Sequence, residues 1–164
     1  MIFETKNFYV DLVNNNDLNE IIEIYNSNEH FLVAHLDKNK ITNQWIIEEI
    51  ESMKEIGFYS GKIVEKSSGK IIGVMDFKVG EESYLSLLMI HNDFKGKGFG
   101  KLIFQAFEEY VKSLKSKSIR IDVVTNYDSS VLDFWIKNGF IQLKDIELNW
   151  AGKKLPAVTM KKNL

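Results

Sequence analysis

The chain has 164 residues, of which 45% are hydrophobic and 27% charged, a composition typical of one globular domain. It has no cysteine, which excludes disulfides, thiolate metal sites and a cysteine nucleophile. Lys and Arg number 21 against 23 Asp and Glu, and this net charge of −2 argues against binding nucleic acid through bulk charge. We therefore expect a single domain over residues 1–164, no nucleic-acid partner, and only local anion sites.

The amino terminus lacks a basic segment followed by an apolar one, and no apolar stretch approaches the length that spans a membrane. The sequence thus predicts a soluble, cytoplasmic protein with no membrane partner. His30, His35 and His91 show no metal-ligand spacing with nearby acids. Each histidine is expected to lie in a loop or to be satisfied by a structural hydrogen bond, and no metal is expected.

Hydrophobic spacing predicts that the first third of the chain is mainly helical, after a strand around residues 8–13. Asp17 opens a helix with one apolar face, and Glu20 occupies the position of a capping-box acid. A second helix is expected to begin near Thr42 and to end at Gly57.

The period then changes to that of strands, and residues 58–64 and 71–79 are expected to form a hairpin. The next strand, residues 84–90, ends in a run that is apolar on both faces, as expected for a central strand covered on both sides. A long amphipathic helix follows from about Gly98, and residues 119–124 alternate as a strand does.

The last third contains a shorter helix over residues 129–138, closed by Gly139, and a final hairpin from residues 140–150 and 157–160. Hairpins therefore flank a strand–helix–strand unit. This order predicts an α/β fold with a mixed sheet.

Three of the ten glycines lie within five residues, in the loop DFKGKGFGK (93–101) between the central strand and the long helix. Glycine permits positive φ and the close approach of a ligand, and a helix amino terminus offers unpaired N–H groups and roughly +0.5 of charge. Lys95, Lys97 and Lys101 add cations to the same loop. The sequence therefore predicts an anion site suited to phosphate.

Two known nucleotide-binding motifs can be compared with this loop. A P-loop requires G-x-x-x-x-G-K-[ST], but Leu102 follows the Gly100-Lys101 pair, so that motif is excluded. A dinucleotide fingerprint requires G-x-G-x-x-G, whereas these glycines are spaced G-x-G-x-G. Asp122 lies at about the right distance along the chain for a ribose ligand, so a dinucleotide-binding enzyme is kept as an alternative.

Residues 88–102, LMIHNDFKGKGFGKL, resemble motif A of the GNAT superfamily of acyl-CoA-dependent N-acetyltransferases. The motif's signature, Q/R-x-x-G-x-G/A, falls on Lys95, Gly98 and Gly100. Residues 129–140, SSVLDFWIKNGF, are similar to the family's N/S-x-x-A-x-x-F-Y/W-x-K-x-G-F segment. The resemblance covers essentially the whole chain. It implies a GNAT-like fold with a central mixed, mostly antiparallel sheet of about seven strands and about four helices.

The resemblance also implies acetyl-CoA as co-substrate. Main-chain groups of Met89 and Ile90 are expected to contact the pantetheine arm as an added strand would. The loop amides are expected to hold the pyrophosphate, and Asn126 and Ser129 to make polar contacts, with helix capping as the alternative role of Ser129. The expected cofactor-binding residues are Met89, Ile90, Lys95, Gly96, Lys97, Gly98, Phe99, Gly100, Lys101, Asn126, Ser129 and Trp135.

Acetyl transfer to an amine needs a group that accepts a proton from the amine and a group that protonates the departing thiolate. Glu81 and Glu82, just before the central strand, are the carboxylates that the sequence places best to accept the amine proton through a water. The alternative is that they simply lie in a solvated turn. In many relatives a tyrosine protonates the thiolate, but Trp135 holds that position here. Tyr127 and Tyr84 are the candidate substitutes.

The leading hypothesis is therefore an enzyme that moves an acetyl group from acetyl-CoA to a primary amine of a small molecule or peptide. A non-catalytic CoA-binding sensor or interaction module is the alternative that Trp135 favours. The acidic run at residues 48–51 fits a cationic acceptor as well as a solvated helix face. The sequence leaves the acceptor and the oligomeric state open, and a homodimer is compatible with it.

Overall fold

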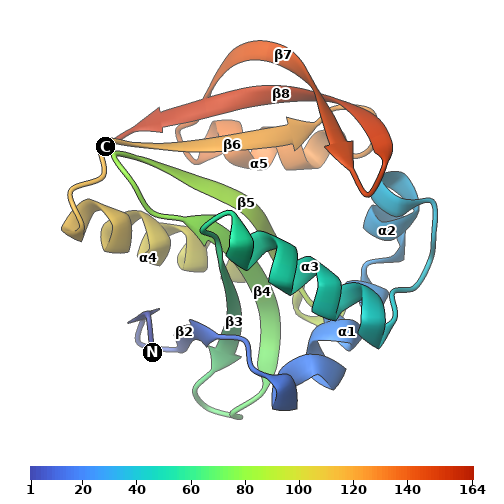
Figure 1. The fold of residues 1–164 in the computed structure, drawn as a ribbon. Coiled ribbons are helices and arrows are strands. Elements are labelled where there is room, and N and C mark those ends of the chain that lie inside the picture. Colours follow the sequence, from blue (N-terminus) through green and yellow to red (C-terminus); the bar gives the residue numbers. More distant parts are fainter.

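The computed structural model describes residues 1–164 and contains one eight-stranded sheet in the order β1-β2-β3-β4-β5-β6-β8-β7 (Figure 1). All neighbouring strands are antiparallel except β5 and β6. The strands are β1 (Phe3–Glu4), β2 (Phe8–Leu12), β3 (Tyr59–Glu65), β4 (Ile71–Lys78), β5 (Glu82–Ile90), β6 (Ser118–Val124), β7 (Ile141–Trp150) and β8 (Lys153–Asn163). The helices are α1 (Leu18–Ser27), α2 (Glu29–Leu36), α3 (Asn43–Glu55), α4 (Phe99–Ser113) and α5 (Ser129–Lys137).

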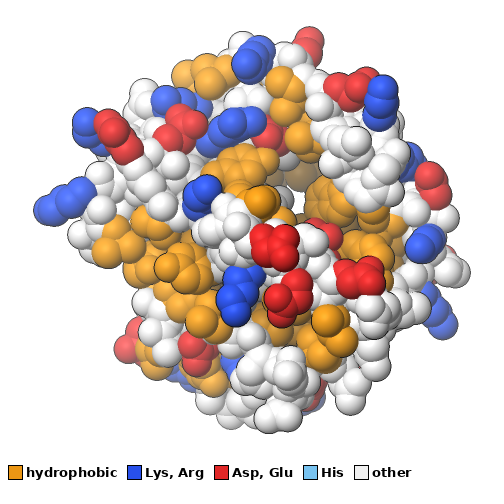
Figure 2. Space-filling model, viewed as in Figure 1, with side chains coloured by type: hydrophobic (Ala, Val, Ile, Leu, Met, Phe, Trp, Pro, Cys, Tyr) orange, Lys and Arg blue, Asp and Glu red, His pale blue; other side chains and the backbone are white.

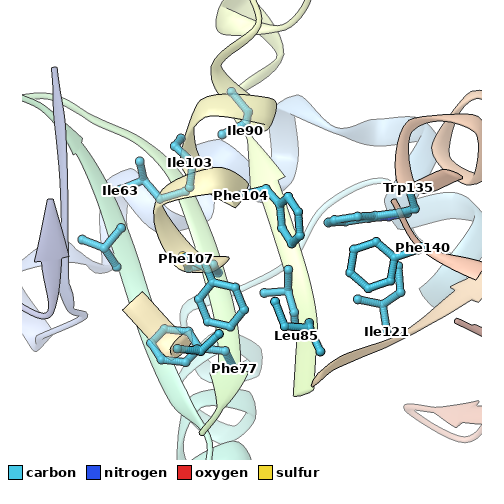
Figure 3. Close-up of a cluster of buried hydrophobic side chains, with 14 of the residues drawn as sticks. Ile63, Phe77, Leu85, Ile90, Ile103, Phe104, Phe107, Ile121, Trp135 and Phe140 are labelled. Carbon is cyan, nitrogen blue, oxygen red and sulfur yellow. The ribbon is translucent and has the colours of Figure 1, made fainter. Parts of the chain in front are cut away.

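Two hydrophobic clusters hold the helices against opposite faces of this sheet. The larger cluster joins α4 and α5 to the strands, and Figure 3 shows Phe104 and Phe107 of α4 pointing toward residues such as Phe77 and Leu85. The smaller cluster joins α1, α2 and α3 to inward-facing residues of β4 and β5. The central strand β5 is thus covered on both faces, which explains its nearly continuous apolar sequence.

Strands β5 and β6 diverge after a short parallel segment. Their pairing is limited to Glu82↔Ser118, Ser83↔Ile119 and Tyr84↔Arg120. Figure 1 shows the two strands spreading apart from the end nearest the carboxyl terminus. Beyond Tyr84, the edge of β5 that faces β6 has no strand partner, so main-chain groups there are available to an extended ligand.

A β-bulge sharpens this divergence. Asp76 of β4 pairs with Leu87 and Phe77 pairs with Leu85, so Ser86 of β5 has no partner on β4. An extra residue in one strand bends it and increases its twist. The bulge therefore lies at the point where β5 turns away from β6.

The structure confirms the GNAT-like α/β fold and every helix and strand that the sequence predicted, with eight strands and five α-helices in place of about seven and four. The additional elements are the two-residue β1 and the helix α2. The capping prediction was wrong in detail. Asn14 accepts a hydrogen bond from the backbone of Asn16, while the Asp17 side chain caps Asn14 and Glu20 takes no part.

The fold contains neither a membrane-spanning helix nor a metal-binding cluster of side chains. None of its helices has both the length and the apolar character needed to cross a bilayer. No cluster of three or more His, Asp or Glu side chains is arranged to hold a metal ion. The predicted absence of a metal stays a prediction.

Asp76 is a buried carboxyl under α1 and α3, and it makes stability dependent on pH. Burial first, and then the negative charge of Glu49, raise its pKa to about 7. Between the unfolded pKa of about 3.9 and pH 7 the folded protein binds one more proton, so stability falls as pH rises through this window and levels off above it. The Asp76→Asn variant is expected to lack this fall, and its stability should exceed that of the wild type by up to about 4 kcal/mol at pH 8, because each pKa unit corresponds to about 1.4 kcal/mol. Urea unfolding between pH 4.5 and 8.5 measures the effect, and parallel curves for the two proteins would contradict it.

Candidate active site

The loop between β5 and α4 leaves open space where side chains would otherwise stand. Gly96 and Gly98 have φ of +76° and +80°, and a Cβ built on either would meet no heavy atom within 4 Å. Gly98 is also the N-cap of α4. These glycines therefore keep an unfilled concavity at the start of the helix, which only glycine can form without backbone strain.

The amide groups of residues 96–101 make no hydrogen bond within the chain. The first bonds around them are Lys95 N to the carbonyl of Asn92, before the loop, and Leu102 N to the carbonyl of Gly98, after it. Six consecutive N–H groups are thus free at the positive end of a 15-residue helix. This arrangement is suited to bind phosphate oxygens.

Three lysines surround these amides, as the sequence predicted. Lys95 and Lys101 line the adjoining pocket, and the Lys97 ammonium lies 5.4 Å from the ring centre of Phe94. Burial lowers the pKa of Lys95, and the nearby carboxylate of Asp128 opposes this effect. The loop is therefore locally cationic in a chain whose net charge is −2.

The first pocket, of about 490 Å³, runs from this loop along the end of β5, between that strand and α5. Its walls come from Leu87–Ile90 of β5, from the loop, and from α5 through Val131, Phe134 and Trp135. Met89 and Ile90 thus line this pocket, and their predicted contact with a pantetheine arm stays a prediction. The pocket has an anion-binding end and a mostly apolar end, which matches a ligand with a phosphate group and a long uncharged arm.

The second pocket, of about 220 Å³, continues from the first toward the other face of the sheet. The two share Phe31, Leu87, Leu88, Tyr127, Val131 and Trp135. The second pocket is completed by α2, β6 and β7. Figure 2 shows a hollow lined by hydrophobic side chains between these strands and α3, with acidic side chains gathered over α3.

Tyr127 lies at the junction of the two pockets and lines both of them. Burial raises the pKa of its phenol, and the charge of Asp128 adds to this effect. The phenol therefore stays protonated at neutral pH. Of the predicted catalytic residues, Tyr127 is the one that lines both pockets.

The structure separates Glu81 and Glu82 from both pockets. They lie at the beginning of β5, where Glu81 pairs with Lys117 at 2.7 Å and Glu82 with Lys161 at 3.0 Å. The first pocket lies toward the other end of this strand, which has nine residues and a length of roughly 30 Å, and the second pocket begins along β5 at Tyr84. Neither glutamate lines a pocket, and both carboxylates are engaged in ion pairs, so the structure does not bring them to the junction of the two pockets.

Asp122 is held inside the protein and does not fit the role of a ribose ligand. Its side chain is 3% exposed and accepts hydrogen bonds from the Tyr84 hydroxyl at 2.7 Å, Thr159 at 2.8 Å and Arg120 at 3.0 Å. With its carboxylate oxygens engaged, it has no capacity left for a dinucleotide. Tyr84, the other candidate acid, donates its hydroxyl hydrogen bond to this carboxylate. It lines the second pocket, away from the loop.

The start of α5 reaches the first pocket through residues other than those predicted. Asn126 and Ser129 are absent from the lining, and Asp128 and Ser130 take their place. Asp128 is also the N-cap, because it accepts a hydrogen bond from the backbone of Ser130 at 2.9 Å. Trp135 lines both pockets and packs edge-on against Phe104 at 5.3 Å between ring centres.

Several residues of the pockets were not predicted from the sequence: Asn28, Phe31, His35 and Trp150. Asn28 is buried and donates a hydrogen bond to the carbonyl of Ile90 at 3.1 Å, which fixes α2 beside the end of β5. The other three form one aromatic group with Tyr127. No local pattern identifies them, because α2 and β7 meet only in the folded chain.

The sequence matches the family model described as the acetyltransferase (GNAT) domain over residues 4–164. The chain belongs to this family and is a GNAT-type acetyltransferase. This result agrees with the free amides at the start of α4, which lie at the first pocket, and with the divergence of β5 and β6, whose residues line the second.

Solved structures of similar fold come from several acetyltransferases. One from Thermus thermophilus has a TM-score of 0.79 and 16% identity, covering 96% of this chain and 97% of that chain. Spermidine N-acetyltransferase from Vibrio cholerae, in complex with CoA and spermine, has a TM-score of 0.73 and 14% identity, and the match covers 97% of this chain and 96% of that chain. Ribosomal-protein-alanine N-acetyltransferase from Brucella melitensis has a TM-score of 0.69 and 16% identity, and the match covers 95% of this chain and 99% of that chain. At these identities the likeness establishes the fold alone. No curated protein matches the sequence significantly.

Proposed function

We propose that this enzyme transfers an acetyl group from acetyl-CoA to a primary amine of a small molecule or peptide. The observation that carries the proposal is the row of six free amides at a lysine-flanked helix terminus, opening into a pocket that continues to a second one. Acetyl-CoA supplies an activated acetyl thioester. A single domain over residues 1–164, a cytoplasmic location and a homodimer stay predictions.

The residues present fit coenzyme A along the first pocket. The amides of residues 96–101 and the Lys95 and Lys101 ammonium groups would bind the phosphates. The amide groups of the pantetheine arm would lie along the edge of β5 that has no strand partner, near Met89 and Ile90. This direction would place the thioester at the junction beside Tyr127, where that phenol can give a proton to the departing sulfur.

The second pocket is proposed as the acceptor site because it joins the first at that junction. A primary alkylamine has a pKa near 10.4 and reaches the enzyme mainly as an ammonium ion. The glutamates of α3 beside the hollow in Figure 2 would attract such a cation. The aromatic walls of the pocket would then hold the uncharged part of the acceptor.

Release of free CoA tests the proposed activity. The protein is mixed with acetyl-CoA and with spermidine, 2-phenylethylamine or an alanine-terminated peptide, and thiol is measured over time. Turnover with at least one amine is expected. Stabilisation by acetyl-CoA, about 2.7 kcal/mol at 100 times its Kd, without thiol release from any amine would instead support the non-catalytic acyl-CoA sensor.

Substitution of Gly98 by Ala is expected to weaken acetyl-CoA binding about 10- to 100-fold. The new Cβ would occupy the concavity at the amides, and each lost charge-assisted hydrogen bond costs about 1.5–3 kcal/mol. Gly69→Ala is the matched control, because Gly69 also has positive φ (+70°) and open space but lies in the β3–β4 turn. Both variants are expected to lose about 1–2 kcal/mol of stability through left-handed backbone strain. Calorimetry should show the affinity loss for Gly98→Ala alone, and equal affinities would contradict the proposed site.

A further inference from the structure

His35 of α2 is a buried histidine whose proton position is fixed by its own helix. The residue is 3% exposed, and its Nδ1 lies 2.8 Å from the carbonyl oxygen of Phe31. A carbonyl oxygen only accepts hydrogen bonds, so Nδ1 carries the hydrogen and donates it. In the neutral ring, Nε2 then carries a lone pair, and it has no hydrogen-bond partner within the chain.

The imidazole is part of the wall of the second pocket. It stacks on Phe31 with ring centres 3.8 Å apart and meets the edges of Tyr127 and Trp150 at 5.2 Å each. All four residues line that pocket. The ring is thereby held next to Tyr127, the residue at the junction where the two pockets meet.

The surroundings of His35 keep its ring neutral at physiological pH. Burial lowers its pKa, the bond to Phe31 opposes this, and the positive charge of Lys153 lowers it further. Lys153 of β8 pairs with Asp37 at 2.5 Å, which shields part of that charge. The remaining titratable neighbours in the pocket are the phenol of Tyr127 and the hydrogen-bonded pair of Tyr84 and Asp122. No carboxylate pairs with the imidazole, so the hydrogen bond to Phe31 alone offsets part of the cost of charging it.

We propose that His35 is the catalytic base, its Nε2 accepting the proton that the acceptor nitrogen loses as it is acetylated. The proposal rests on the proposed function. The neutral amine forms an N–C bond with the acetyl carbon as the C–S bond breaks. The nitrogen proton passes to His35 Nε2, and the phenol proton of Tyr127 passes to sulfur. One proton relayed from His35 to Tyr127 through solvent restores both groups.

The carboxylates of the chain that could compete for this role are already engaged. Asp122 accepts four hydrogen bonds, and Asp128 caps α5. Glu81 and Glu82 lie at the far end of β5 in ion pairs. His35 is thus the basic group with a free lone pair on a side chain that lines the proposed acceptor site.

The pH dependence of kcat/KM tests this role with the fastest amine of the panel. Below the pKa of His35, both the amine and the imidazole must lose a proton before reaction, so log kcat/KM of the wild type should rise with pH with a slope of 2. Above that pKa only the amine must lose one, and the slope should be 1. His35→Gln should keep slope 1 throughout and lose about 100-fold at pH 7.5. His35→Asn, whose amide can still donate to Phe31, should behave alike. His30→Gln, an exposed histidine of the same helix outside both pockets, should keep the change of slope.

Slope 2 in both His35 variants, with wild-type rates, would overturn the proposal. Nitrogen-15 NMR of histidine in the wild type decides it without a variant: the expected state at pH 7.5 is a neutral His35 with hydrogen on Nδ1 and a bare Nε2. A protonated Nε2 would overturn it. Calorimetry with acetyl-CoA distinguishes failure of the His35 proposal from failure of the proposed function. A His35 variant that binds acetyl-CoA normally is compatible with the proposed function, whereas a wild type without affinity for acetyl-CoA contradicts that function.

Discussion

The Tyr127→Phe variant is expected to lose about 100-fold in kcat for acetyl transfer, while its affinity for acetyl-CoA changes little. The substitution removes one hydroxyl and keeps the ring that packs against Phe31 and His35. The thiolate would then leave without a proton donor at the junction of the two pockets. Because burial raises the pKa of Tyr127, no loss of activity from its ionisation is expected below pH 10.

Rapid mixing with detection of free thiol measures this effect, and calorimetry measures the affinity. Tyr59→Phe is a suitable control, because Tyr59 is 46% exposed and lies outside both pockets. If the Tyr127→Phe enzyme had the same kcat as the control, Tyr127 would not be the general acid, and another group would have to protonate the thiolate. Trp135, which holds the position of the family's tyrosine, cannot take that role because its indole nitrogen only donates a hydrogen bond and is not a useful acid.

The loop at residues 95–101 could be predicted from the sequence because its chemistry is local. Glycine spacing, lysine content and the start of a helix are all visible within nine residues, and the structure places them as predicted. The same holds for α4, whose apolar stripe contains Ile103, Phe107 and Val111, all buried. Such features depend on the order of residues and little on distant contacts.

Helix α2 could not be predicted because it has no polar face of ordinary width. Leu32, His35 and Leu36 are buried, and Phe31 contacts Trp150 of β7, so apolar residues occur around most of the helix. Two-residue β1 falls below the length at which alternation can be recognised. The role proposed for His35 follows from these long-range contacts, which explains why its sequence context suggested an ordinary structural histidine.

The error on Glu81 and Glu82 has a different origin. The sequence itself shows that these residues precede β5 and that the glycine loop follows it. A strand of nine residues separates the two by roughly 30 Å. The length of the strand was therefore the signal that should have assigned the carboxylates to the opposite end of the sheet.

Substitution of Phe107 by Ala is expected to destabilise the protein by about 3–5 kcal/mol. Phe107 is fully buried on α4, with ring centres 5.2 Å from Phe77 and 6.2 Å from Phe3 (Figure 3). Its removal would leave a cavity between α4 and the strands β1 and β4. Domains of this kind have total stabilities of about 5–15 kcal/mol, so the loss is a large share of the whole.

Urea unfolding measures this loss, with an unchanged m value as the sign that the unfolded and folded states keep their compactness. Leu102→Ala is the matched control, because Leu102 lies on the same helix but is 44% exposed, and it should cost less than about 1 kcal/mol. Equal losses in the two variants would contradict the packing described for the larger cluster. Because Phe107 lies outside both pockets, Phe107→Ala protein that remains folded at low temperature should still bind acetyl-CoA. Stability and cofactor binding would then be separable along α4, with its first turn serving the ligand and its middle serving the core.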